Sequence, residues 1–170
     1  MQRICVVGNS GSGKSHLARR IAARLGLPYV ELDALNHRAG WQEAPLAEFR
    51  AELTAALGAS GWVVDGNYRA RVGDLLDADT VVWLDYPRWV VFGRVVRRTV
   101  GRLVLRRELW NGNREQWRNL LSRDPDRSIL AWSWTQHASY RRAYAAAAAD
   151  ASWARLRSPR AARRWLAHLG

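Results

Sequence analysis

The chain of 170 residues has one cysteine and no long apolar run. A single cysteine cannot form an internal disulfide, so we expect Cys5 to pack as a thiol inside a buried strand, in a reducing compartment. No stretch of about 18 uncharged apolar residues occurs, which excludes a predicted membrane span. The short apolar run before Gly8 has no cleavage site behind it, so no signal peptide is expected. These absences together predict a cytoplasmic protein.

Lysine is nearly absent as well. Of 27 basic residues, 26 are arginine, and Lys14 is the only lysine. A bias toward arginine has replaced lysine wherever the two can substitute for each other. Lys14 therefore marks a position that needs a compact ammonium on a flexible stem and does not accept a planar guanidinium. The net charge of +12 indicates anionic partners, with nucleotides first and nucleic acid as an alternative.

Lys14 lies in a glycine-rich motif, G-x-x-x-x-G-K-S, at residues 8–15. The motif follows a predicted strand and precedes a predicted helix, which is the context that a phosphate-binding loop requires. Its glycines let backbone N–H groups turn toward an anion, and the helix N-terminus adds positive charge there. We expect Lys14 to reach the β- and γ-phosphates of ATP and Ser15 to bind Mg²⁺. The alternative is a chance glycine-rich turn.

The candidate nucleotide-binding residues are those of the loop, the residue after it and one arginine near the C-terminus: Gly8, Asn9, Ser10, Gly11, Ser12, Gly13, Lys14, Ser15, His16 and Arg157.

Apolar runs alternate with helical patterns, which is typical of an α/β domain with a parallel sheet. The predicted strands are residues 3–7, 28–32, 62–65, 80–84 and 152–157. The predicted helices are residues 14–25, 47–57, 89–109, 128–149 and 159–169. No repeat and no Gly-, Ser- or Pro-rich linker divides the chain. We therefore expect one three-layer P-loop NTPase domain over residues 1–170, with five parallel strands and helices on both faces.

Acidic residues end two of the predicted strands, at the sheet edge where α/β proteins bind ligands. Alternation places Glu31 and Asp33 on the same side. One could order a magnesium-bound water, and the other could accept a proton from an attacking hydroxyl. We take Asp33 as a catalytic and acceptor-binding candidate; the alternative is that it caps the helical turn that follows. Asp65 ends the third strand and is a candidate for organising Mg²⁺.

The segment Asp65-Gly66-x-x-Arg69 resembles the D-G-x-x-R element of adenylate kinases and related small-molecule kinases. The resemblance implies that Asp65 holds Mg²⁺ through water and that Arg69 grips the phosphate of the acceptor. Asn67 and Tyr68 depart from that pattern, because adenylate kinases have an aromatic residue and a proline there. The identity of the acceptor therefore stays open.

A wider set of motifs resembles the topology modulation (FlaR-like) branch of the adenylate-kinase-like P-loop kinases, over nearly the whole chain. The name of that branch records a link to DNA topology, whereas its fold implies a kinase. The motifs are the loop at 8–15, Leu-Asp-Ala-Leu at 32–35 with Gly-Trp at 40–41, Asp-Gly-Asn-Tyr at 65–68, Trp-Leu-Asp-Tyr-Pro-Arg at 83–88 and Leu-Arg-Ser-Pro-Arg at 156–160.

Arginines at positions 94, 98, 102 and 106 would form one stripe on the predicted helix 89–109, with 97 and 107 beside it. Like charges at this spacing cost about 0.2–0.5 kcal/mol per pair, so an anion is expected to offset them. The resemblance implies that arginines of this region close over the transferred phosphoryl group. Arg94 and Arg98, nearest the strand end, are the candidate catalytic cations. The alternative is a solvated helix face enlarged by the arginine bias.

Turn signals near residues 111–114 and 123–126 flank a short helical segment, 115–122. We expect a small helical lid at about residues 110–126 that excludes water on closure. Trp41, which follows a glycine in a loop, is a candidate for contacting the acceptor. The resemblance also favours Arg141 or its neighbour Arg142, on the helix after the lid, as a phosphate contact; we take Arg141.

The predicted function is transfer of the γ-phosphoryl group of ATP, with Mg²⁺, to a small acceptor, a nucleotide or related metabolite. The main alternative is a nucleic-acid-associated ATPase or DNA-topology modulator, in which the arginine helix contacts a phosphate backbone. Binding of that kind should weaken steeply with salt. A nucleotide-binding regulator without turnover is a third interpretation, against which Asp33, Asp65 and the arginines argue.

Replacing Lys14 tests the loop assignment. Lys14→Ala should abolish phosphoryl transfer and leave the fold intact, because the side chain serves phosphate and not packing. Lys14→Arg should fail as well, since the loop has no room for a planar fork. Rates of ADP release and circular dichroism measure the two effects. Turnover near the wild-type rate in the arginine variant would contradict the argument from the lone lysine.

Overall fold

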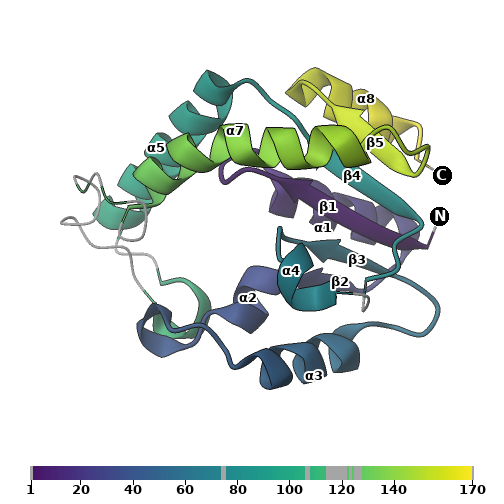
Figure 1. Cartoon of the computed structure of the whole chain (residues 1–170), viewed down its shortest axis with the longest axis horizontal. Coiled ribbons are helices and arrows are strands. Elements are labelled where there is room, and N and C mark those ends of the chain that lie inside the picture. Colours follow the sequence, from purple (N-terminus) through teal and green to yellow (C-terminus); the bar gives the residue numbers. More distant parts are fainter. Residues whose placement is uncertain are drawn as a thin grey trace.

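The computed structural model describes residues 2–73, 76–105, 108–113, 122, 124 and 128–169. Five parallel strands form one sheet in the order β2-β3-β1-β4-β5. Their bounds are Arg3–Gly8 (β1), Tyr29–Glu31 (β2), Trp62–Asp65 (β3), Thr80–Leu84 (β4) and Trp153–Leu156 (β5). The expected five-stranded parallel α/β fold is confirmed (Figure 1).

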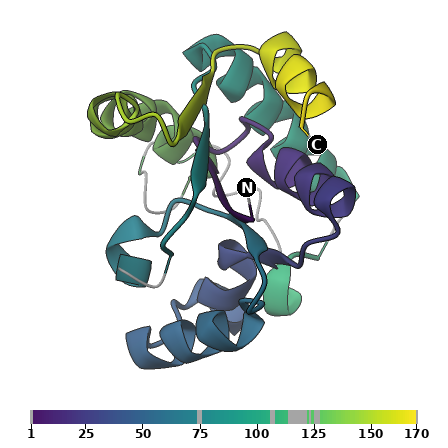
Figure 2. The same cartoon turned by 90° about the vertical axis from the view of Figure 1, so that its right-hand side faces the viewer.

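Helices cover both faces of this sheet and one end of it (Figures 1 and 2). The longer helices are Lys14–Leu25 (α1), Leu46–Ala56 (α3), Arg88–Val104 (α5), Ile129–Ala147 (α7) and Pro159–Ala167 (α8). The shorter ones are Leu32–Asn36 (α2), Ala39–Trp41 (η1), Arg69–Val72 (α4) and Trp110–Gly112 (η3). Within the described residues, no helix is both long enough and apolar enough to cross a membrane.

The period-two alternation of the strands separates two hydrophobic layers. On β1, Ile4 and Val6 are fully buried and face the layer of α1 and α8, where they pack with Ile21 and Leu166. Cys5 and Val7 point to the opposite face. Both faces of the central strands are thus covered, which is why these strands are apolar at nearly every position.

The opposite face is covered by α3, α4 and α7. Phe49 and Leu53 of α3 are fully buried and pack in the same cluster as Val64 of β3. Farther along the sheet, Tyr144 of α7 makes an edge contact with Trp83 of β4, at 5.8 Å between ring centroids. Trp83 therefore has the core role that its place in a strand predicts.

Some boundaries differ from those predicted. The strand predicted at 28–32 ends at Glu31, because the chain turns into α2 at Leu32, whose side chain is buried. The helix predicted at 89–109 ends at Val104. The short elements α2, η1, α4 and η3 were not predicted, since three to five residues carry too little periodicity to be recognised. The predicted lid segment 115–122 lies outside the described residues, apart from Ser122.

Candidate active site

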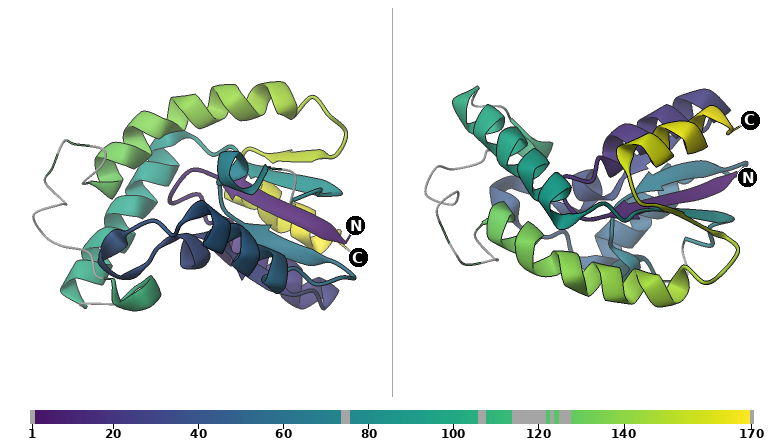
Figure 3. Two further views of the ribbon diagram at one scale, coloured as in Figure 1. Left: turned by 60° about the horizontal axis from the view of Figure 1, so that its bottom comes forward. Right: turned by 90° about the horizontal axis from the view of Figure 1, so that it is seen from above.

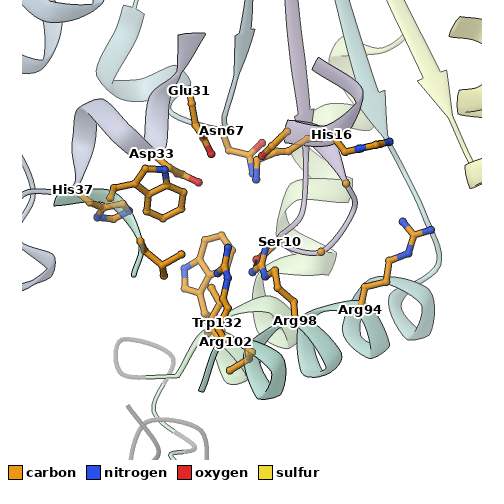
Figure 4. A pocket seen from close by; sticks show the side chains of 18 of the residues that line it. Ser10, His16, Glu31, Asp33, His37, Asn67, Arg94, Arg98, Arg102 and Trp132 are labelled. Carbon is orange, nitrogen blue, oxygen red and sulfur yellow. Dashed lines mark hydrogen bonds between the residues drawn. The ribbon is translucent and has the colours of Figure 1, made fainter. Parts of the chain in front are cut away.

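A cavity of about 1760 Å³ opens beyond the carboxyl ends of the strands (Figure 4). The glycine loop and α1 form one side of it, α5 forms a second, and the segments around α2, η1 and η3 form the far end. The described residues that line the cavity include Lys14, Asp33, Asn67, Arg98 and Trp41. The position matches the rule that ligands of open α/β sheets lie outside the carboxyl ends.

The loop between β1 and α1 has the backbone of an anion-binding site. Gly11 and Gly13 have positive φ angles of +82° and +92°, which residues with a side chain rarely adopt. Helix α1 begins at Lys14, and Gly13 provides no side-chain cap. The N–H groups of the first helical turn are therefore left for a ligand, and the partial positive charge of the helix end favours phosphate there.

Asn67 clamps the start of the loop from the end of β3. Its Nδ2 donates to the carbonyl oxygen of Gly8 at 2.8 Å, and its Oδ1 accepts from the Gly8 N–H at 3.0 Å. The Tyr144 hydroxyl of α7 donates to the same Oδ1 at 3.3 Å. On the other side of the loop, Asn9 donates to the carbonyl of Ser133 at 2.7 Å. Sequence analysis noted Asn67 only as a departure from the adenylate kinase pattern and missed this role.

Asp65 lies buried beside the loop, at 1% exposure, and the parallel register places it next to Glu31 of β2. The Tyr29 hydroxyl donates to its Oδ2 at 3.2 Å. Burial raises the pKa of Asp65, while the charge of Lys14 and the Ser15 hydroxyl act to lower that pKa. Lys14 and Ser15 are the residues that the loop motif assigns to phosphate and to the metal, so Asp65 lies where a carboxylate would contribute to a magnesium site.

The donor set at this point fits Mg²⁺. Oδ1 of Asp65 is buried and has no hydrogen-bond partner among the described residues. In the same part of the chain, no group of three or more His, Cys, Asp or Glu could hold a metal ion by itself. Mg²⁺ in nucleotide sites typically takes one or two protein oxygens and completes its shell with water and phosphate oxygens. Ser15 and Asp65 supply oxygens of that kind.

Asp33 lies in the first turn of α2, and its carboxylate faces the cavity (Figure 4). The N-cap of α2 is Glu31, so Asp33 is not the cap that the alternative interpretation proposed. The Tyr68 hydroxyl donates to Oδ1 of Asp33 at 2.8 Å and lies 3.3 Å from Nε2 of His37. Burial raises the pKa of Tyr68, so this hydroxyl stays a proton donor to Asp33.

Glu31, the second carboxylate considered at the end of β2, forms an ion pair with Arg19 at 2.8 Å. The ion pair offsets its charge, whereas the described contacts of Asp33 include no cation. The structure thus distinguishes the two carboxylates that sequence analysis left open. Both carboxylates line the cavity, and Asp33 is the one without an ion pair among the described residues.

The arginines of α5 face the glycine loop and the cavity (Figure 4). Arg94 donates to the carbonyl oxygen of Ser12 at 3.1 Å, and Arg98 donates to the Ser10 hydroxyl at 2.8 Å. Arg102, one turn farther along, also lines the cavity. The predicted stripe therefore borders the phosphate site. Its last members, at positions 106 and 107, lie outside the described residues.

The far end of the cavity has an aromatic corner. Trp41 stacks edge-on against His37, at 5.5 Å between ring centroids, and lies 6.5 Å from Trp110. Trp41 has a φ of +61°, a conformation that costs a bulky residue roughly 1–2 kcal/mol. Its N–H donates to Oδ1 of Asn113 at 2.9 Å, which holds the strained backbone in place. Strain of this kind is concentrated at functional sites.

The remaining predicted site residues lie at different distances from this cavity. His16 is exposed and lines it. Arg141 pairs with the buried Asp85, with Nε 3.2 Å from Oδ1, and Arg155 donates to the other carboxylate oxygen. Arg157 is exposed after β5, outside the described lining of the cavity. The backbone of Arg69 begins α4, but its side chain lies outside the described part of the chain.

Comparison with solved structures finds the same fold. A gluconokinase from Sinorhizobium meliloti 1021 aligns over 99% of this chain and 93% of its own, with 20% identity and a TM-score of 0.55. The chain shares its fold. A shikimate kinase from Bacteroides thetaiotaomicron aligns over 99% and 95% of the two chains, with 15% identity and a TM-score of 0.48. No protein-family model matches the sequence, and no curated protein does.

Substitution of Asn67 tests whether its two hydrogen bonds to Gly8 support nucleotide binding. Asn67→Ala should weaken ATP binding by about tenfold, because it leaves the Gly8 peptide without two hydrogen bonds, each worth about 0.5–1.5 kcal/mol, and loosens the loop. Tyr144→Phe is the matched control, since it removes only the 3.3 Å contact to the same amide and should change affinity by less than about threefold. Isothermal titration calorimetry with ATP measures both. Equal affinities for wild type and Asn67→Ala would show that the loop holds its shape without the clamp.

Proposed function

We propose that this chain is an ATP-dependent phosphotransferase that uses Mg²⁺ and acts on a small acceptor, a nucleotide or a related metabolite. One observation carries the proposal: the glycine loop, Lys14 and the α5 arginines border one end of a single cavity, and Asp33 and an aromatic corner border the other. The fold shared with a gluconokinase supports the same class of reaction. Such an arrangement suits in-line transfer between two ligands bound end to end.

In this proposal the loop N–H groups and Lys14 bind the β- and γ-phosphates. Ser15 and Asp65 would hold Mg²⁺, which when bound would neutralise phosphate charge. Arg94 and Arg98 of α5 donate hydrogen bonds to the loop, so their guanidinium groups would be within reach of the oxygens that gain charge during transfer. Catalysis then rests mainly on positioning and charge neutralisation.

Asp33 is the general base in this proposal. It accepts the proton of the acceptor hydroxyl as that oxygen attacks the γ-phosphorus. The hydrogen bond from Tyr68 fixes the orientation of its carboxylate and leaves one oxygen free for the acceptor. Trp41, with His37, provides an apolar wall against which the acceptor packs. Arg69 would contact an anionic group of the acceptor, as the resemblance to adenylate kinases implies.

The proposal also includes the subtype of the kinase and its location in the cell. An adenylate-kinase-like subtype in the topology modulation branch rests on the motifs at 65–69 and 83–88. A cytoplasmic location rests on the use of ATP and on the single cysteine, which cannot form an internal disulfide. The rival use of the arginine helix as a nucleic-acid contact is less well supported. The described arginines of the stripe border the cavity, where only a ligand inside it would reach them.

A screen of nucleotides and small metabolites for acceptor-dependent ADP release tests the proposal. At least one acceptor should raise ADP release well above the rate without acceptor, and the signal should require both Mg²⁺ and Lys14. The Lys14→Ala variant is the control for contaminating kinases. Binding of ATP with no acceptor-dependent turnover across a broad panel would favour a nucleotide-binding regulator.

Substitution of the buried Asp65 tests its proposed role in binding Mg²⁺. Asp65→Asn should retain ATP binding but lose most of the magnesium-dependent rate, because the amide keeps the shape and removes the charge. Without Mg²⁺ the same variant should be more stable than wild type at pH 7. Burial raises the pKa of Asp65 in the folded state, so the ionised carboxylate costs stability above the ordinary aspartate pKa of about 3.9.

The stability difference should shrink as the pH falls toward the ordinary aspartate pKa, because the raised pKa of Asp65 makes the folded chain take up the proton before the unfolded chain does. Thermal unfolding at pH 4 and pH 7, with and without Mg²⁺ and ADP, measures it. Glu31→Gln is a matched control, because Glu31 is the register neighbour of Asp65 and is already paired with Arg19. A variant with unchanged rate and magnesium dependence would reduce Asp65 to a structural strand end.

A further inference from the structure

The arginines of this chain fall into groups by what their guanidinium groups contact. A first group forms ion pairs with carboxylates: Arg3, Arg19, Arg38, Arg71, Arg141 and Arg155. A second group, on α5, lines the cavity: Arg94, Arg97, Arg98 and Arg102. A third group is exposed on α1 and α8, and we call it the basic face: Arg20, Arg24, Arg160, Arg163 and Arg164.

The basic face is built from two neighbouring helices. Helices α1 and α8 lie side by side on the same side of the sheet (Figures 2 and 3). Both bury their apolar residues in one cluster, which includes Ile21 of α1 and Leu166 of α8. The guanidinium group of Arg24 donates to the carbonyls of Ala167 and Leu169, so the two helices are also joined at their C-terminal ends.

The spacing of the arginines directs them outward. On α1, positions 20 and 24 are one turn apart, and on α8 positions 160, 163 and 164 fall within one turn, opposite the buried Ala162 and Leu166. Each helix therefore presents an apolar stripe to the sheet and a cationic stripe to solvent. At a rise of about 1.5 Å per residue, the arginines cover about 6 Å along each of the two neighbouring helices.

No counter-charge belongs to this face. Neither α1 nor α8 contains an aspartate or glutamate, although the chain has 15 acidic residues. Among the described residues, the five arginines form no ion pair with a carboxylate. Pairs such as Arg160 and Arg164 repel each other at the i, i+4 spacing. The face thus concentrates positive charge, and among its five arginines the described hydrogen bonds involve Arg24, which donates to carbonyls at the end of α8.

We propose that the basic face binds the phosphate backbone of duplex nucleic acid without sequence specificity. This inference goes beyond phosphoryl transfer and does not depend on it. Arginine forks match phosphate oxygens in a bidentate geometry. Duplex DNA carries phosphates every 3.4 Å along each strand, so the arginines of each helix span about two steps of one strand. Five cations are enough for a salt-sensitive contact that carries no base readout.

The composition of the face favours this partner over other polyanions. Amphipathic helices that bind membrane surfaces bury large apolar side chains in the lipid. The exposed large hydrophobic residues of the described chain, such as Trp89, Val104 and Trp134, lie on α3, α5, α7 and the loops, and none is on α1 or α8. Proteins that bind single strands stack bases on aromatic side chains, and this face exposes none. A duplex requires neither feature.

Fluorescence anisotropy with the full chain and labelled 20-base-pair duplexes of unrelated sequence tests the proposal. All duplexes should bind equally, and the affinity should fall with salt with a log–log slope of about −4.5, five contacts at about 0.9 each. Arg160→Gln/Arg164→Gln should weaken binding on the order of tenfold to a hundredfold at 100 mM salt and make the slope shallower by about 1.8. Phosphoryl transfer should be unchanged in this variant.

The charge-matched control is Arg88→Gln/Arg142→Gln, which removes two arginines of α5 and α7 that are not part of the basic face. It should leave duplex affinity and slope close to wild type. An equal loss in both double variants would show that net charge, and not this face, attracts the duplex. Competition by saturating ADP would place the duplex in the cavity and overturn the proposal. Failure to bind duplex at 50 mM salt, with or without binding to phosphatidylserine vesicles, would overturn it too.

Discussion

Helix α5 packs directly on the glycine loop, and the geometry of the phosphate site depends on this contact. A Cβ at Gly11 would lie 2.5 Å from the carbonyl oxygen of Val91 and 2.5 Å from a methyl group of Val95. Only glycine leaves room for α5 at that distance. Because the two valines are one turn apart and face the loop, the arginines that follow them are carried to its rim. The helix that packs on the loop therefore also brings Arg94 and Arg98 to the place where the proposed function puts the phosphates.

A second constraint comes from the parallel sheet. Parallel register brings the ends of β1, β2 and β3 to one edge, so Val6, Glu31 and Asp65 lie in one row. Positive groups come from the loop and α5, and negative groups come from the strand ends. Asp65 is buried between the two sets, which costs free energy that a bound cation would return. Oδ1 of Asp65 reflects that cost, because it is buried and has no hydrogen-bond partner among the described residues.

The sequence was sufficient to predict the five strands, the long helices and the loop, because each has either strong periodicity or a motif with a known mechanism. It also predicted that the strand-end acids and the α5 arginines would meet. It could not predict the clamp of Asn67 on Gly8 or the bond from Tyr68 to Asp33, since both join residues 35 or more positions apart. A residue pattern shows which side chains carry chemistry, but tertiary packing decides which of them restrain one another.

The backbone conformation of Trp41 also could not be predicted from the sequence. Its position after a glycine indicated an exposed aromatic residue, and nothing local indicated that the residue would take a positive φ. That conformation is held by Asn113, which lies on a segment 72 positions away and also donates to the carbonyl of Arg38. Long-range hydrogen bonds thus offset the strain of a backbone conformation that residue propensities would not predict. The aromatic corner exists only because two loops meet.

The arginine excess shows why composition alone cannot assign a partner. Coding bias explains why arginine stands in place of lysine, but it does not explain where positive charge is placed. The structure separates arginines that pair with carboxylates from those on α5, which border a cavity, and from the five arginines of the basic face, which do neither among the described residues. Net charge would be the same if all of them were paired with distant acids. The position of each basic side chain relative to the carboxylates therefore carries the functional information. Lys14 is the extreme example, because its position determines even that the side chain is lysine and not arginine.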